Sequence, residues 1–203
     1  MAAPVSSSQR IRLFKSERLE KLTLISPRTF AVSWAVMLPL IAFAGWGSAS
    51  PLQAFGLVAA GLISWTLFEY AMHRYLFHLD STVPLVRWLV FLIHGNHHDN
   101  PKDAMRGLMP LVVSVPVGAL IWAACVALLG KPGTFALLGF MIGYVVYDTV
   151  HYACHHLPMQ GRLRAILKRH HMRHHYVDEN ANFAISAIFW DRVFGSRIRS
   201  LKR

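Results

Sequence analysis

The sequence is poor in charged residues and in cysteine, and each shortage excludes a class of protein. Only 15% of its 203 residues are charged, whereas about 25% is usual in soluble domains. With 54% hydrophobic residues and a mean hydropathy of +0.37, the composition favours one membrane-embedded domain over an ordinary soluble one. Two cysteines, Cys125 and Cys154, are too few for a disulfide framework or a cysteine-rich zinc site.

Acidic residues are scarce as well, and the resulting net charge of +11 needs an explanation. No DNA- or RNA-binding motif accompanies the basic excess, so we expect no nucleic acid partner. Every Lys and Arg except Lys131 lies in the N-terminal segment 1–28, between Met72 and Leu108, or after Tyr147. Positive residues concentrate in the cytoplasmic segments of membrane proteins. The distribution therefore predicts that both termini and the central segment are cytoplasmic, in a bacterial inner membrane or the endoplasmic reticulum.

Four long hydrophobic runs carry the apolar composition, and we expect each to span the lipid bilayer as a helix. The runs are 29–46, 52–72, 108–129 and 134–150. Short links rich in Gly, Ser and Pro join them into two helical hairpins. A cleaved signal peptide is the alternative for the first run, but this run is longer than a typical signal core and follows a long segment that contains acids.

The expected fold is an all-α integral membrane protein with four transmembrane helices and a helical cytoplasmic cap. Residues 1–28 form a basic cytoplasmic segment, residues 29–203 form one domain, and the cap comes from segments 73–107 and 151–203. The histidines mark this cap, because all 12 lie in four clusters beside the runs. The clusters are His73 and His78; His94, His97 and His98; His151, His155 and His156; and His170, His171, His174 and His175.

The spacing within the clusters brings imidazoles together. On a helix of 3.6 residues per turn, residues three and four apart share one face, as His94, His97 and His98 do. His73 and His78 are five residues apart. We therefore expect these two to approach the site from its side or to serve different metals.

Histidines crowded in this way indicate a metal site, because protonated imidazoles repel one another whereas a metal ion binds neutral ones. Imidazole suits zinc, copper, iron and nickel, so the residue type does not select the element. Ten or more candidates exceed the four ligands of a structural zinc and predict two metal ions close together. Glu69 and Asp148 are costly in apolar surroundings, and we expect both to orient imidazole N–H groups from outside the ligand set.

The order and spacing of the clusters resemble the histidine signature of the membrane fatty acid hydroxylase and sterol desaturase superfamily. The matching segments are His73-Arg-Tyr-Leu-Phe-His78, His94-Gly-Asn-His97-His98, His151-Tyr-Ala-Cys-His155-His156 and His171-Met-Arg-His174-His175. Flanking segments at 69–70, 143–148 and 190–195 are similar to those of the fatty acid and ceramide 2-hydroxylase branch. The resemblance covers residues 64 to 196.

The resemblance implies O2-dependent hydroxylation of a fatty acyl chain, free or lipid-linked, at C2 by a centre of two iron ions. Carried over position by position, the implied ligands are His73, His78, His94, His97, His98, His151, His155, His171, His174 and His175, with His156 and His170 as further candidates. Zinc is able to replace iron in purified protein. Eukaryotic members carry a fused cytochrome b5 domain that this sequence does not show. We therefore expect electrons from a separate carrier, such as a cytochrome b5-like protein or a ferredoxin, docked on the basic face.

Two other functions remain open at this point. Hydroxylation or desaturation of a sterol or carotenoid ring uses related histidine boxes, and lipid analysis would separate it from acyl hydroxylation. A membrane metal transporter belongs to a different class and predicts ligands along the membrane interior. The clusters instead follow the apolar runs on one predicted side of the membrane.

Overall fold

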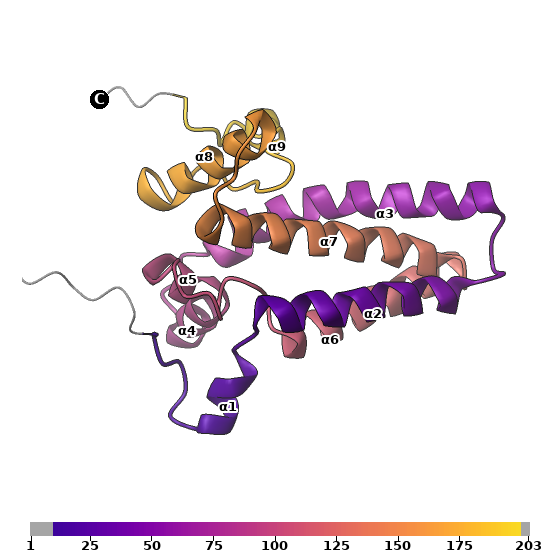
Figure 1. Cartoon of the computed structure of the whole chain (residues 1–203), viewed down its shortest axis with the longest axis horizontal. Coiled ribbons are helices and arrows are strands. Elements are labelled where there is room, and N and C mark those ends of the chain that lie inside the picture. Colours follow the sequence, from indigo (N-terminus) through magenta and orange to yellow (C-terminus); the bar gives the residue numbers. More distant parts are fainter. Residues whose placement is uncertain (1–9, 200–203) are drawn as a thin grey trace, which may run out of the picture.

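The structure, a computed structural model, describes residues 10–199, and this part of the chain folds into helices without a β-strand (Figure 1). The long helices are α2 (Pro27–Gly45), α3 (Pro51–Ala71), α6 (Leu111–Leu129) and α7 (Gly133–His156). The shorter ones are α1 (Glu17–Leu22), η1 (Met72–Phe77), α4 (Pro84–Val90), η2 (Phe91–Gly95), α5 (Asn96–Asp99), α8 (Arg162–Tyr176) and α9 (Trp190–Val193). The predicted all-α architecture is confirmed.

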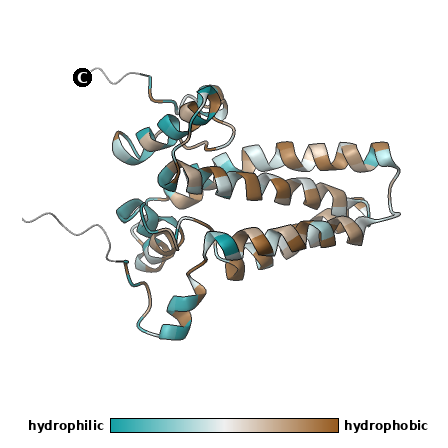
Figure 2. Ribbon diagram, in the orientation of Figure 1, coloured by the Kyte–Doolittle hydropathy of each residue, from teal (hydrophilic) through white to brown (hydrophobic). Residues whose placement is uncertain are grey.

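Four helical stretches are long and apolar enough to cross a membrane, as the four hydrophobic runs predict. They are Pro27–Gly45, Pro51–Phe77, Leu111–Leu129 and Gly133–His156. Figure 2 shows hydrophobic residues along these helices and hydrophilic residues concentrated at the end that carries α5 and α8.

The third helix starts three residues after its hydrophobic run, because Pro110 is extended at φ −61° and ψ 146° and caps the helix. A proline also disfavours helical geometry in the residue before it, here Met109. The fourth run and the third histidine cluster form one continuous helix, α7, as their short separation requires.

Helix α7 lies at the centre of the bundle and contacts α2, α3 and α6 (Figure 1). Its contact with α3 depends on two glycines. A Cβ atom on Gly61 would lie 1.9 Å from the carbonyl oxygen of Ala136, and one on Gly139 would lie 1.9 Å from that of Val58. Small residues allow membrane helices to approach until their backbones touch. The two helices that lead into the first and third histidine clusters are thereby held at a fixed separation.

An aromatic cluster fills the space between α2, α3 and α7. The ring of Tyr144 lies edge-on to Trp34, with ring centroids 5.2 Å apart, and to Trp65, at 5.4 Å. Phe140 packs edge-on against Trp65 at 5.0 Å. Edge-to-face contacts of this kind add to the energy of burial and fix the relative rotation of the helices. The aromatic cluster therefore packs the three helices together beside the residues that lead into the histidine-bearing cap.

Candidate metal centre

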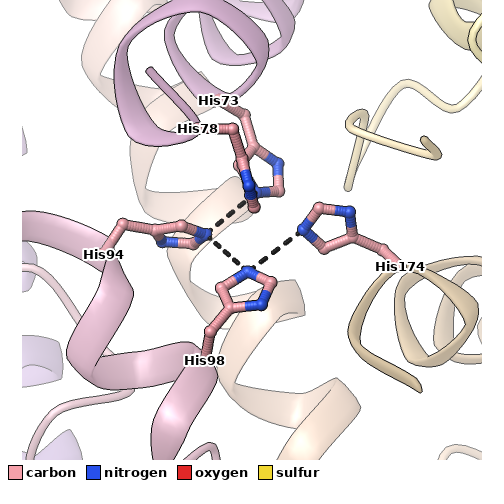
Figure 3. Close-up of side chains that lie close together, drawn as sticks. All are labelled: His73, His78, His94, His98 and His174. Carbon is pink, nitrogen blue, oxygen red and sulfur yellow. Dashed lines mark hydrogen bonds between the residues drawn. The ribbon is translucent and has the colours of Figure 1, made fainter. Parts of the chain in front are cut away.

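Ten of the twelve histidines come together in two groups of five. The first group is His73, His78, His94, His98 and His174, and the second is His97, His151, His155, His171 and His175. Within each group, one ring nitrogen per residue lies within 4.8 Å of the others. Figure 3 shows the imidazoles of the first group pointing toward a common centre from separate segments of the chain. Each group has the donor set and the spacing of a site for one metal ion.

A π-helix brings His73 and His78 into the same group. The α-helical α3 continues directly into η1, a π-helix from Met72 to Phe77. Because a π-helix pairs each residue with the one five positions later, a five-residue spacing stacks side chains that an α-helix would spread apart. The Nε2 atoms of His73 and His78 lie 3.3 Å apart. Of the two alternatives expected for this pair, service to different metals is not met, because both histidines belong to the first group.

The second and fourth clusters each contribute to both groups. On η2 and α5, His94 and His98 belong to the first group, while His97, between them in sequence, belongs to the second. On α8, His171 and His175 belong to the second group and His174 to the first. The two groups are adjacent, since the rings of His98 and His175 stack with centroids 4.2 Å apart. Helices α5 and α8 thus set the distance between the two groups of histidines.

Burial keeps these imidazoles neutral. It lowers the pKa of His78 to about 4 and, together with neighbouring histidines, that of His98 to about 3. The pKa of His94, His97 and His171 falls well below the usual range for the same reasons. A neutral imidazole has a free lone pair at one nitrogen, which is the form that binds a metal ion. Near neutral pH these imidazoles are therefore already neutral, and a metal ion can bind without displacing protons from them.

Backbone carbonyl groups orient two of the grouped histidines. His73 donates from Nδ1 to the carbonyl oxygen of Phe183, and His174 donates from Nδ1 to that of Ala181, at 2.8 Å. These bonds leave both Nε2 atoms facing the first group. Hydrogen bonds at the second ring nitrogen fix the tautomer and the ring orientation of a metal ligand. The backbone at 181–183 is thus part of the site, although no residue type there marks it.

Asp191 holds that backbone segment in place. Its fully buried carboxylate accepts hydrogen bonds from the backbone N–H groups of Phe183 and Ala184, both at 2.9 Å. It also accepts bonds from His170 Nε2 at 2.9 Å and from the hydroxyl of Ser196 at 2.7 Å. Sequence reasoning missed this role. The only available signal was an acid inside the flanking segment 190–195.

The other two histidines, His156 and His170, lie outside both groups. His170 bonds to Asp191 and so supports the segment that orients its neighbours. The ring of His156 stacks on Tyr152, with centroids 4.3 Å apart. Neither further candidate joins the ten imidazoles that converge.

Glu69 and Asp148 do not bond to an imidazole among the described residues, so the expectation that they orient histidines directly is not met. Glu69 accepts hydrogen bonds from the Trp65 indole, from the Ser186 hydroxyl, and from backbone N–H groups at 185–187. Asp148 accepts a bond from the backbone N–H of Met109, at 3.0 Å. Backbone N–H groups buried outside regular structure require acceptors. Glu69 therefore attaches cap residues 185–187 to α3, and Asp148 attaches the segment that leads into α6 to α7.

A cavity of about 490 Å³ extends from the histidines along the membrane helices. His94, His97 and His151 line its histidine end. Its walls are mainly apolar and include Phe68, Val113, Val117, Ile121, Phe140 and Met141. Leu19 and Leu22 of α1 also line it, and a buried ion pair between Glu20 and Arg106 attaches α1 to the segment that precedes α6. An extended apolar molecule fits a cavity of this lining.

Comparisons with known proteins agree with this arrangement. The family model described as fatty acid hydroxylase matches residues 58–196, which include all four histidine clusters. Dihydroceramide fatty acyl 2-hydroxylase FAH2 of Arabidopsis thaliana is 33% identical over 202 residues, covering 95% of this chain and 82% of that protein. Ceramide very long chain fatty acid hydroxylase scs7 of Schizosaccharomyces pombe is 40% identical, covering 67% of this chain and 40% of that protein. The solved structure of full-length scs7p, in which only the hydroxylase domain is visible, has a TM-score of 0.82 at 32% identity and covers 89% of this chain and 70% of that one.

Proposed function

Because the chain belongs to the fatty acid hydroxylase family, we propose that it is a membrane monooxygenase that hydroxylates a fatty acyl chain at C2. The observation that carries the proposal is the apolar cavity that ends at two adjacent groups of buried histidines. Relatives named as fatty acyl 2-hydroxylases support the position of the new hydroxyl group. The substrate class is a membrane lipid or a free fatty acid with an extended acyl chain.

We propose that the two groups of five imidazoles hold two iron ions. The fit rests on the donor set: each group offers five ring nitrogens within 4.8 Å of one another, without a protein carboxylate among them. When bound, iron supplies the redox chemistry that inserts one oxygen atom of O2 into an aliphatic C–H bond. Neutral imidazoles also bind zinc, so the metal found after purification depends on what is available.

The residues around the cavity position the substrate. Apolar walls from α3, α6 and α7 exclude water and hold the acyl tail, while the carbonyl end of the chain lies at His94, His97 and His151. Fixing one carbon near the reacting centre removes much of the entropic cost of the reaction. This placement makes C2 the carbon that reacts, because carbons farther along the tail lie deeper in the cavity.

The reaction also requires a source of electrons. Insertion of one oxygen atom into the C–H bond and release of the other as water consume two electrons and two protons. We propose that a separate acidic carrier, a cytochrome b5-like protein or a ferredoxin, delivers the electrons. Its proposed docking surface is formed by the exposed arginines of α8, Arg162, Arg164 and Arg169, because the same helix carries His171 and His175 of the second group.

We further propose that the metal centre and both termini face the cytoplasm. All Lys and Arg residues except Lys131 lie outside the two short links at the far end of the bundle. That asymmetry follows the rule that cytoplasmic segments are positive. Metal transport is less compatible with the site, because the grouped histidines gather at one end of the bundle instead of lining a path through it.

The deciding experiment is mass spectrometry of hydrolysed lipids from cells that express the chain under 18O2. We expect 18O-labelled 2-hydroxy fatty acids with the native chain and none with the double variant His97→Ala and His174→Ala, which removes one ligand from each group. The matched control is His156→Ala, which lies outside both groups and should keep the product.

A folded, metal-loaded native chain that gives no such product with a competent reductant would refute the proposal. A hydroxylated ring lipid would point to sterol or carotenoid chemistry, and redox-independent metal uptake into sealed vesicles would point to transport.

A further inference from the structure

A second, smaller pocket lies on the surface beside α9, away from the cavity that reaches the histidines. It has a volume of about 300 Å³. The side chains of Arg192, Arg197 and Arg199 line it together with Asp191 and Gly195. All three arginines are exposed, and none forms a hydrogen bond or an ion pair from its side chain within residues 10–199. Three guanidinium groups around one pocket form a strong positive field without an assigned partner.

The single acid in this pocket does not neutralise the field. One carboxylate oxygen of Asp191 accepts hydrogen bonds from the backbone of Phe183 and from the Ser196 hydroxyl. The other accepts bonds from Ala184 and His170. Both oxygens are therefore occupied by groups from the interior. An external anion remains the natural counterion for the three arginines.

The position of α9 identifies the source of this anion. The Trp190 indole donates a hydrogen bond of 3.1 Å to the hydroxyl of Thr66, which lies within the candidate membrane span Pro51–Phe77. Beside it, Phe189 and Val193 expose 49% and 62% of their surface. A short segment with exposed apolar residues next to a membrane helix and arginines at its edge is typical of the membrane–water interface. Headgroup phosphates lie at this level.

We propose that Arg192, Arg197 and Arg199 bind the headgroup phosphate of an anionic phospholipid. Gly195, at φ +72°, allows the chain to turn back after α9, which brings Arg197 and Arg199 to the same pocket as Arg192. The planar guanidinium group matches phosphate oxygens with two parallel donors. Phe189 and Val193 would contact the acyl chains of the same lipid.

Binding at this pocket supports the metal centre through the backbone. The carbonyl oxygen of Ser196 accepts a bond from the backbone N–H of Asn182, at 2.8 Å. The Asn182 side chain in turn accepts a bond from the backbone N–H of Ile198, at 2.9 Å. Asn182 lies between Ala181 and Phe183, the residues whose carbonyl groups orient His174 and His73. A lipid that holds 197–199 in place therefore also stabilises the segment that orients two imidazoles. This inference is independent of the reaction that the site performs.

The test uses the purified full chain in neutral detergent, with thermal unfolding measured during titration. Phosphatidylglycerol, phosphatidylcholine and inorganic phosphate are titrated in separate arms. We expect phosphatidylglycerol alone to raise the unfolding temperature, and the triple variant Arg192→Gln, Arg197→Gln and Arg199→Gln to lose roughly tenfold or more in apparent affinity for it. The matched control, Arg162→Gln with Arg164→Gln and Arg169→Gln, removes the same charge from α8 and should keep the response.

Three results would contradict the proposal. If the α8 control and the triple variant lose the response equally, general surface charge is responsible and the pocket is not a binding site. If inorganic phosphate raises the unfolding temperature as much as the lipid does, the pocket binds a free anion and the lipid assignment is overturned. If the triple variant does not fold, Arg199→Gln alone takes its place, and an unchanged lipid affinity in that variant would also count against the proposal.

Discussion

The helices α6 and α7 are neighbours that are both long and apolar enough to cross a membrane, yet they are buried to very different extents. Of the most apolar 18-residue stretch, 50% is buried in α7 and only 6% in α6. Helix α7 packs against α2, α3, α6 and α8 and carries His151 and His155. Helix α6 has one buried residue, Ser114, and contributes Val113 and Val117 to the wall of the large cavity. Tight packing is thus concentrated where the ligands need fixed positions, while the wall nearest the lipid has few restraints.

The largest effect should follow from disturbing the tightly packed pair, by the change Gly139→Leu on α7. The new side chain would overlap the Val58 backbone, which side-chain movement is unable to relieve. We expect a loss of about 3 kcal/mol or more of stability, and little folded, metal-loaded protein. Thermal unfolding measures the loss of stability, and metal analysis of the purified protein measures how much of it is metal-loaded.

Gly118→Leu on α6 is the matched control for that variant. A Cβ atom there would lie 3.5 Å from the Met141 side chain, an ordinary contact. The Gly118→Leu protein should fold and bind metal. If the two variants lost equal stability, the contrast between α7 and α6 would be wrong.

The next largest effect should come from Asp191→Asn, which acts on the metal centre from outside the ligand groups. Four buried groups donate hydrogen bonds to the Asp191 carboxylate, two to each oxygen. The side-chain amide of Asn accepts only through its single oxygen, so two of these four donors would lose their partner. We expect metal affinity to fall by about 10- to 100-fold, as is typical when the groups that orient metal ligands are removed. Competition with a chelator measures this affinity.

Asp178→Asn is the control for Asp191→Asn, because Asp178 is exposed and lies after α8 in the same region of the cap. Its metal affinity should match that of the native chain. Unchanged affinity in Asp191→Asn would show that the carbonyl groups at 181–183 keep their positions without the carboxylate.

A more selective effect is expected from Val117→Phe, on the loosely packed helix. The larger ring would fill part of the cavity, and long acyl chains should lose about tenfold in kcat/KM relative to short ones. Val115→Phe is the control, since Val115 is on the same helix but does not line the cavity. The chain lengths of the hydroxylated products are measured for both variants. If Val117→Phe and Val115→Phe gave the same distribution of chain lengths, the acyl chain would bind elsewhere.

The smallest effect should follow from Glu20→Gln, which weakens the attachment of α1 over the cavity. Burial alone would raise the pKa of Glu20, but backbone N–H groups of Phe14 and Leu13 and the Arg106 guanidinium outweigh burial and lower it below 4.5. The ion pair therefore stabilises the native protein above that pH, and this contribution is lost as the pH falls through the lowered pKa. We expect Glu20→Gln to cost about 1 kcal/mol of stability near neutral pH, the net contribution of a typical hydrogen bond.

The readout for Glu20→Gln is stability as a function of pH. Glu17→Gln provides the comparison, since Glu17 pairs with Arg12 on the exposed surface and should change little. The native chain and Glu20→Gln should approach each other in stability only when the pH falls below the lowered pKa of Glu20, where both side chains are neutral. A constant difference at all pH values would exclude the carboxylate charge as the cause.

Residue type and spacing predict the membrane helices and the converging histidines well, because hydrophobic length and helical periodicity act locally. The same periodicity misleads at His73 and His78, where the chain changes from α- to π-helix without a residue that announces it. The roles of Glu69 and Asp191 are equally hidden. Their partners are mainly backbone N–H groups from other segments, and such long-range pairing has no local signature.

The division of histidines along α5 and α8 has a consequence for metal exchange. Each helix sends histidines to both groups, so if each group holds one ion, as proposed, the separation of the two ions is a property of the backbone and not of a shared ligand. A smaller or larger ion would alter bond lengths within its own group while the distance between the two centres stayed nearly constant. Chains loaded with different metals should therefore show nearly the same intermetal distance.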